Sequence, residues 1–145
     1  MLKTLMLVVV ALLWQQGVLS IEEHCKECIC ANSGGRTGSA GNCSMPAKGT
    51  CLNGVYCGPY GMSIQYWIDA GSPSGNFYDC MNDWECSNKT LEVYGTKYCQ
   101  TQFVGHAPPC SCEEQARIHH CGPYSIHAQF CDSYWFGYMQ PCIGS

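Results

Sequence analysis

Cysteine and histidine side chains are the groups in this sequence whose spacing first suggests chemistry. Two short cysteine clusters lie far apart in the chain, and two adjacent histidines follow the second cluster. Thiolates and imidazoles at such spacings are typical ligands of structural zinc sites. In an oxidising compartment the same thiols pair as disulfides instead. The residues are Cys25, Cys28 and Cys30 in the first cluster, and Cys110, Cys112, His119 and His120 in the second.

The first twenty residues favour the oxidising compartment. Lys3 supplies a positive start, residues 5–14 form an apolar run, and Ser20 follows at a position suited to cleavage. That apolar run is too short to cross a bilayer, which needs about 20 residues. We therefore predict a signal peptide over residues 1–20, one domain over 21–145, and a secreted, extracellular protein without a membrane anchor.

The cysteine content supports a disulfide scaffold. All 14 cysteines follow the predicted signal peptide, and a content above about 10% in a short secreted chain is typical of such scaffolds. The even number lets every thiol pair. We therefore predict disulfides, no metal site and no cofactor, while the pairing stays open. The cysteines are Cys25, Cys28, Cys30, Cys43, Cys51, Cys57, Cys80, Cys86, Cys99, Cys110, Cys112, Cys121, Cys131 and Cys142.

The charge balance excludes some partners. Without Lys3, six basic and eleven acidic side chains remain, together with five histidines. Nucleic-acid binding needs a basic face, so none is predicted. Full protonation of the histidines would bring the net charge close to zero, so the protein is much less anionic in an acidic compartment. Nothing in the sequence indicates association, and we expect a monomer.

Turn signals and apolar periodicity divide the predicted domain into a lobe and a helical body. Residues 31–58 are rich in Gly, Ser and Asn, which indicates a lobe of loops and short strands, and Asn53-Gly54 is typical of a tight hairpin turn. Helical spacing appears over 60–70 and, most clearly, over 82–98. A third helix is expected over 113–120, with acids at its start and histidines at its end.

The end of the chain is aromatic. After Gln129 the sequence carries five aromatic side chains within nine residues, and we expect this tail to pack back on the core. They are Phe130, Tyr134, Trp135, Phe136 and Tyr138.

Four short patterns, in this order, resemble those of the invertebrate-type lysozymes, also called the destabilase family. The resemblance covers residues 24–140, and it implies an α+β, lysozyme-like domain: a helical body, a small disulfide-rich lobe and a saccharide cleft between them. The patterns are Cys25-x2-Cys28-x-Cys30, Cys57-Gly58-Pro59-Tyr60 running to Tyr66-Trp67-Ile68-Asp69, Cys80-x2-Asp83-x2-Cys86-x3-Thr90-x3-Tyr94, and Cys112-x3-Ala116-Arg117-Ile118-His119.

The family's reaction, as the resemblance implies it, is hydrolysis of the β-1,4 link between N-acetylmuramic acid and N-acetylglucosamine. That reaction uses two carboxylic side chains, one protonated and one ionised. The family's acid is a glutamate before Ser-Gly, and here Asn32 occupies that place. An amide has no acidic proton to give. The second carboxylate is missing too, because the chain has no Asp or Glu between Glu27 and Asp69. No catalytic residue is therefore predicted.

Saccharide contacts carried over from the family fall on nine positions. Ser63 stands where the family has a lysine, and His120-Cys121 replaces an Asn-Gly pair, so the polar contacts differ. Tyr66 and Trp67 also fit an interpretation as plain core residues. The nine predicted substrate-binding residues are Met62, Ser63, Ile64, Gln65, Tyr66, Trp67, Ile68, Tyr94 and His119.

Several functions stay open at this point. The main hypothesis is a lysozyme-family protein of antibacterial defence or bacterial digestion, whose muramidase activity is weak or absent and whose partner is bacterial peptidoglycan or a related saccharide. The alternative is an inactive binding or immune-modulating protein. An isopeptidase that pairs His119 with Ser33 or Ser44 is a lesser alternative, and a structural cysteine-rich protein is the last.

Two sequons are present. Asn88-Lys89-Thr90 is a predicted N-glycosylation site. Asn42-Cys43-Ser44 matches the pattern formally, but its central cysteine is expected to be bridged, so we do not predict glycosylation there.

Overall fold

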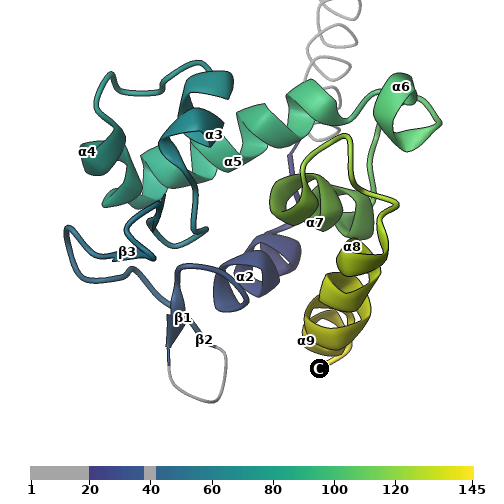
Figure 1. Cartoon of the computed structure of the whole chain (residues 1–145), viewed down its shortest axis with the longest axis horizontal. Coiled ribbons are helices and arrows are strands. Elements are labelled where there is room, and N and C mark those ends of the chain that lie inside the picture. Colours follow the sequence, from purple (N-terminus) through teal and green to yellow (C-terminus); the bar gives the residue numbers. More distant parts are fainter. Residues whose placement is uncertain (1–19, 38–41) are drawn as a thin grey trace, which may run out of the picture.

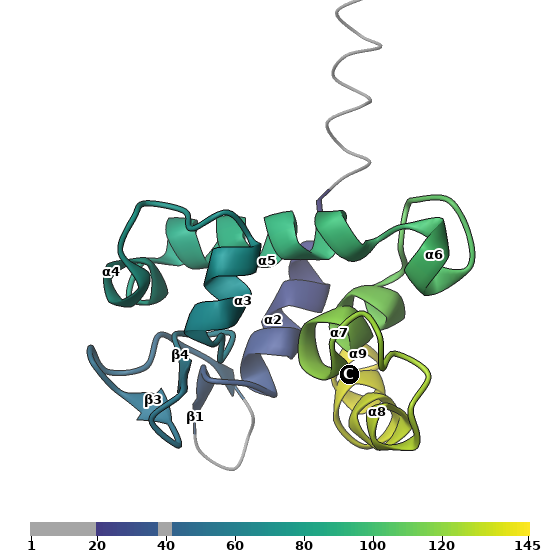
Figure 2. The same ribbon diagram turned by 45° about the horizontal axis from the view of Figure 1, so that its top comes forward.

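The helix α2, Glu23–Ala31, lies at the centre of the molecule. The structure is a computed structural model, and it describes residues 20–37 and 42–145; most of the predicted signal peptide therefore lies outside the described residues. Short strands lie on one side of α2 and the C-terminal helices on the other, while the long helix α5, Trp84–Tyr98, runs above α2 in both views (Figures 1 and 2). The architecture is the predicted small α+β domain.

Three disulfides hold α2 in this position. Its buried cysteines reach α7, Cys112–Cys121, through Cys25–Cys112 and α9, Gln140–Ile143, through Cys28–Cys142. The last of the three, Cys30–Cys43, reaches β2, Asn42–Cys43. Bridges that close long loops restrict the unfolded chain most. The central helix is therefore fixed covalently to both halves of the fold.

All fourteen cysteines form disulfides, which confirms the predicted scaffold. None of them is free to bind a metal, and in the part of the chain that the structure describes no group of three Cys, His, Asp or Glu side chains is placed to hold one. The remaining bridges join neighbouring segments: Cys51–Cys57, Cys80–Cys86, Cys99–Cys110 and Cys121–Cys131.

The small lobe consists of two antiparallel hairpins. β1, Arg36–Thr37, pairs with β2, and β3, Cys51–Leu52, pairs with β4, Tyr56–Cys57. Asn53 and Gly54 both have positive φ, 53° and 71°, as a type I′ turn requires. The predicted hairpin turn is confirmed, and it sets Leu52 opposite Tyr56.

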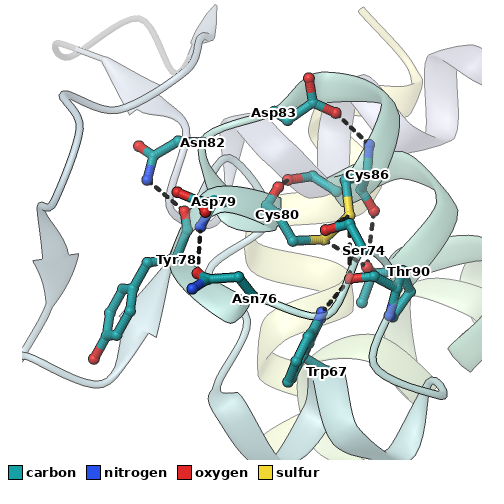
Figure 3. Close-up of a disulfide and its surroundings, with 12 residues drawn as sticks. Trp67, Ser74, Asn76, Tyr78, Asp79, Cys80, Asn82, Asp83, Cys86 and Thr90 are labelled. Atoms are coloured by element: carbon teal, nitrogen blue, oxygen red, sulfur yellow. Dashed lines mark hydrogen bonds between the residues drawn. A yellow bond between two sulfur atoms is a disulfide. The ribbon is translucent and has the colours of Figure 1, made fainter.

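The helices of the body begin where side-chain caps occur. The predicted 60–70 helix is shorter, α3 at Ile64–Asp69, because Ser63 accepts a hydrogen bond from the Tyr66 amide and starts it there. The predicted 82–98 helix is α5, which begins after Asp83, whose carboxylate accepts from the Cys86 amide at 2.7 Å (Figure 3). Two further short helices were not predicted: α4, Phe77–Met81, and α6, Thr101–Val104.

The third predicted helix is α7. Ser111 and Glu114 form a capping box at its start, so the backbone N–H groups of these two residues both have side-chain acceptors. The tail forms α8, Gln129–Tyr134, the π-helix η1, Trp135–Met139, and α9.

The prediction that the tail packs on the core is confirmed for two aromatic side chains and wrong for three. Tyr134 and Trp135 are buried, because one face of the tail helices turns inward. The other face is exposed to solvent, and it carries Phe130, Phe136 and Tyr138. Among the described helices, none has both the length and the apolar character needed to cross a membrane.

Candidate functional site

A cavity of about 660 Å³ lies where the end of α2, the β3–β4 hairpin, α3 and α7 meet. Its lining is aromatic, hydroxylic and imidazole in character, and we call it the cleft. The lining residues are Asn32, Ser33, Gly34, Leu52, Tyr56, Tyr60, Gly61, Ser63, Tyr66, His119 and His120.

Asn32 ends the helix α2 and lines the cleft. Its side-chain Nδ2 donates to the carbonyl oxygens of Cys28, at 2.9 Å, and of Tyr138, at 3.4 Å. Both acceptors are main-chain groups, so the amide fastens α2 to η1. The Asn32 side chain therefore has a structural role, and it supplies no transferable proton.

Among the residues that the structure describes, no carboxylate lines the cleft. Glu27 lies on another surface, its side chain 66% exposed, and forms an ion pair with His24. Asp69, at the end of α3, accepts hydrogen bonds from Lys97 and from the Tyr98 hydroxyl. The pKa of Asp69 stays below its usual value, because those two donors outweigh the cost of partial burial. Neither carboxylate is placed to act on a molecule in the cleft.

His119 is held by both of its ring nitrogens. A carbonyl oxygen can only accept, so Nε2–H donates to the Tyr60 carbonyl, at 2.9 Å. Nδ1 is then the unprotonated nitrogen, and it accepts from the Tyr66 hydroxyl, at 3.1 Å. Burial of the ring, with a smaller contribution from the neighbouring His120, lowers the pKa of His119 to about 4. His119 is thus a neutral, oriented imidazole at pH 7.

Tyr66 forms the aromatic floor of the cleft. Its ring stacks on Tyr94, with centroids 3.7 Å apart, and meets the His119 ring edge to face. Burial raises the pKa of the Tyr66 hydroxyl well above its usual value, so it remains a donor. Stacked and edge-on ring pairs are each worth about 0.5–1.5 kcal/mol beyond their area burial. The floor is therefore rigid before any ligand binds.

The structure brings three of the nine predicted substrate-binding residues into the cleft: Ser63, Tyr66 and His119. Tyr94 lies directly behind Tyr66 and supports it. Among the three, Tyr66 and His119 are joined by a hydrogen bond. The role of all nine residues in binding stays a prediction.

The other five predicted residues lie outside the cleft lining. Met62 and Trp67 are core side chains, 1% and 7% exposed, and the Trp67 indole donates to the Pro73 carbonyl. Trp67 thus agrees with the core interpretation that the sequence left open. The remaining three predicted residues lie on the helix α3 and are not part of the lining; they are Ile64, Gln65 and Ile68.

Sequence reasoning missed the opposite wall of the cleft. Leu52 and Tyr56 are about half exposed and line it from the β3–β4 hairpin. The Asn53-Gly54 turn carries the signal for this pair, since the short loop of residues 53–55 that it begins sets Leu52 and Tyr56 opposite each other. His120 was also missed; its ring stacks on Tyr134, with centroids 3.8 Å apart.

The serine and histidine side chains that the isopeptidase alternative requires do not contact each other through a hydrogen bond. In the described residues no hydrogen bond links His119 to Ser33 or Ser44, because both imidazole nitrogens already have partners. Ser44 is outside the cleft lining, and its hydroxyl donates to the Gly35 carbonyl, at 3.4 Å. A serine nucleophile needs an adjacent base to become reactive, and this geometry supplies none.

Replacing His119 is expected to remove part of the acid sensitivity of the fold. The depressed pKa means that the unfolded chain takes up a proton between pH 6.5 and about 4 and the folded chain does not. Stability is therefore full above pH 6.5 and falls as the pH drops towards 4, by about 1–2 kcal/mol at pH 5. His119→Gln keeps one donor and one acceptor but cannot titrate, so its loss between pH 7 and pH 5 will be smaller.

Urea denaturation of both proteins at the two pH values measures this difference. His127→Gln, at an exposed position, is the matched control for the loss of an imidazole. An unchanged pH dependence in His119→Gln would contradict the assignment of a neutral imidazole with a lowered pKa.

Comparison with known proteins places this fold and cleft in a family. The sequence model of the Destabilase family matches residues 22–142. Lysozyme 1 of Crassostrea virginica is 30% identical over 115 residues, 79% of this chain but only 56% of that protein's length. Invertebrate-type lysozyme of Ruditapes philippinarum is also 30% identical over 115 residues, which cover 79% and 77% of the two chains.

The solved structure of Tapes japonica lysozyme has the same fold. It matches with a TM-score of 0.61 at 28% identity, over 81% of this chain and 87% of that one. The family match covers most of the sequence, and the disulfide-rich α+β architecture agrees with it. The chain therefore belongs to the invertebrate-type lysozyme, or destabilase, family.

Proposed function

We propose that this protein binds the glycan strands of bacterial peptidoglycan, or a related saccharide, in its cleft and acts in antibacterial defence or bacterial digestion. It is secreted, and its muramidase activity is weak or absent. The observation that carries the proposal is the lining of the cleft, which offers aromatic and hydrogen-bonding side chains and, within the described residues, no carboxylate.

The side chains that line the cleft suit saccharide binding. A sugar presents an apolar ring face and a rim of hydroxyls, and aromatic side chains offer the matching flat surface. Tyr56 and Tyr66 supply two such rings, and Ser33 and Ser63 supply hydroxyls. The rigid floor under Tyr66 reduces the conformational entropy that a ligand must overcome. Binding therefore needs none of the groups that hydrolysis needs.

A pull-down on purified peptidoglycan tests binding. Tyr56→Ala removes a half-exposed ring of the cleft and is expected to weaken binding about 2–10-fold, the equivalent of one stacking contact. Tyr78→Ala removes a ring of similar exposure that lies outside the cleft, and it should leave binding unchanged. Equal binding by both variants and the parent would contradict a saccharide site in the cleft.

Turnover is tested on the same polymer from pH 4 to pH 8, with the oxidised protein. We expect binding without appreciable lysis, and Asn32→Glu alone should not restore lysis because the second carboxylate is still missing. A general acid is worth about 10²–10⁴-fold only when the rest of the machinery is in place. Strong lysis by the parent, or by Asn32→Glu, would show that a carboxylate outside the cleft lining takes part.

A further inference from the structure

A second cavity, of about 540 Å³, lies between α2 and the start of α5. We call it the groove. Tyr60 separates it from the cleft, since this buried side chain lines both. Glu23 and Glu27 line the groove from α2, and Trp84 and Asn88 line it from α5. Asn88 is the sequon asparagine, and the proposed saccharide-binding function does not use it. Its side chain therefore lines a cavity separate from the cleft.

The amide of Asn88 is oriented by Tyr60. The Tyr60 hydroxyl donates to Asn88 Oδ1, and burial raises the pKa of that hydroxyl, so the donor persists. Since the oxygen is turned to Tyr60, the nitrogen is turned away from it. Among the described residues, Nδ2 has no hydrogen-bond partner. Nδ2 is the atom to which an N-linked sugar is attached, and here it is free beside the groove.

Trp84 lies one helical turn before Asn88, so the two side chains share a face of α5. Its ring is 41% exposed, and its orientation is fixed by an edge-on contact with Tyr60, with centroids 6.4 Å apart. A sugar on Asn88 would meet this ring face at once. Across the groove, the exposed carboxylate of Glu27 offers an acceptor for an acetamido N–H or a hydroxyl group.

The third sequon residue sets the order of events. Thr90 is fully buried, and its hydroxyl donates to the Cys86 carbonyl at 2.8 Å (Figure 3). A glycosylating enzyme cannot reach it in the folded protein, so transfer precedes folding of α5. In that step Asn88 Nδ2 forms a bond to C1 of the first sugar, the C1–oxygen bond to a lipid-linked pyrophosphate donor breaks, and the amide nitrogen loses a proton.

We propose that Asn88 carries an N-linked glycan whose first N-acetylglucosamine seats in the groove against Trp84. The sugar covers the exposed indole face and adds a contact between α5 and α2. This inference rests on the secretion included in the proposed function, because only a chain that enters the secretory pathway meets the glycosylating enzyme.

The test uses a heterologous leader, so that its result is independent of residues 1–20, and eukaryotic secretory cells blocked in complex-glycan processing. Intact mass with and without peptide N-glycosidase F reports the glycan. Asn88→Gln is expected to abolish the mass shift, and Asn42→Gln, at the other sequon, to leave it intact. The peptidoglycan pull-down is a separate measurement, so failure of the glycan does not imply failure of the cleft.

Seating is tested on the folded glycoprotein. Endoglycosidase H leaves one N-acetylglucosamine on Asn88, and peptide N-glycosidase F leaves none. Trp67 and Trp135 are buried, so acrylamide quenching of tryptophan fluorescence in the chain from Ile21 onwards reports mainly on Trp84. We expect the one-sugar form to be as shielded as the full glycoform and the sugar-free form to lose that shielding. Trp84→Phe should abolish the difference.

Two results would overturn the proposal. Absence of a glycan on Asn88 would show that the proposed modification does not occur. Equal quenching of the one-sugar and sugar-free forms would show that the sugar projects into solvent, even if the glycan is present. Asn88→Gln should match the sugar-free form, which separates loss of the sugar from the new carboxylate that the glycosidase leaves at position 88.

Discussion

Replacing Cys28 and Cys142 together with alanine is expected to lower the free energy of unfolding by about 4 kcal/mol. The two cysteines are 114 residues apart in the sequence. Because Cys25–Cys112 stays closed, the loop that their bridge adds in the unfolded chain runs over residues 25–28 and 112–142, about 33 residues. Removing it also frees the centre of α2 from the last helix. Urea denaturation of the oxidised double variant, compared with the parent, measures the loss.

The bridge between Cys51 and Cys57 supplies the matched control. It closes only six residues, and the same loop-entropy relation assigns it about 2 kcal/mol. The hairpin that it closes carries Leu52 and Tyr56 of the cleft. Its removal should therefore weaken peptidoglycan binding while costing less stability than removal of the long bridge. The two double variants are thus expected to separate stability from binding. Equal losses of stability would contradict the role assigned to the long bridge.

Gly34→Ala is expected to destabilise the protein by about 3 kcal/mol, at the upper end of the cost of overpacking. A methyl group at this position would lie 2.0 Å from the Gly58 carbonyl oxygen and 2.9 Å from the Gly61 amide nitrogen. Both are backbone atoms, so no side-chain rotation can relieve the contact. The chain after Asn32 must shift instead, and the cleft is expected to lose saccharide binding together with stability.

Gly137→Ala is the control for that substitution. Gly137 lies in the helix η1, and a methyl group there meets nothing within 4 Å. Alanine in a helix interior is favoured over glycine by about 0.5–1 kcal/mol, so this variant should be as stable as the parent or more so. Thermal unfolding measures both variants. A neutral Gly34→Ala would mean that the turn after α2 can move away from residues 58–61.

Local sequence signals predicted those parts of the fold that local chemistry determines. The Asn53-Gly54 turn is one, since both residues adopt the positive φ that their types allow. The helix α7 is another, with acids in its first turn and histidines in its last. The full pairing of the cysteines followed from their even number and the predicted secretion.

The central helix could not be predicted in the same way. Residues 23–31 carry three cysteines, and two of them have partners in the C-terminal half, 87 and 114 residues away. The burial that stabilises α2 is therefore set largely by distant segments. The cleft shows the same limit. Trp67 and Tyr66 are adjacent in the sequence and both aromatic, but the Trp67 side chain is buried in the core and Tyr66 lines the cleft. Only the packing of α3 against the other helices distinguishes them.

The three bridges on α2 also bear on how such a protein changes over generations. None of the residues that line the cleft is a cysteine, so the covalent frame and the ligand-facing surface are made of different residues. A substitution in the cleft therefore alters what is bound without releasing the helix that forms its base. Substitutions can therefore change the chemistry of this surface while the bridges beneath it stay closed.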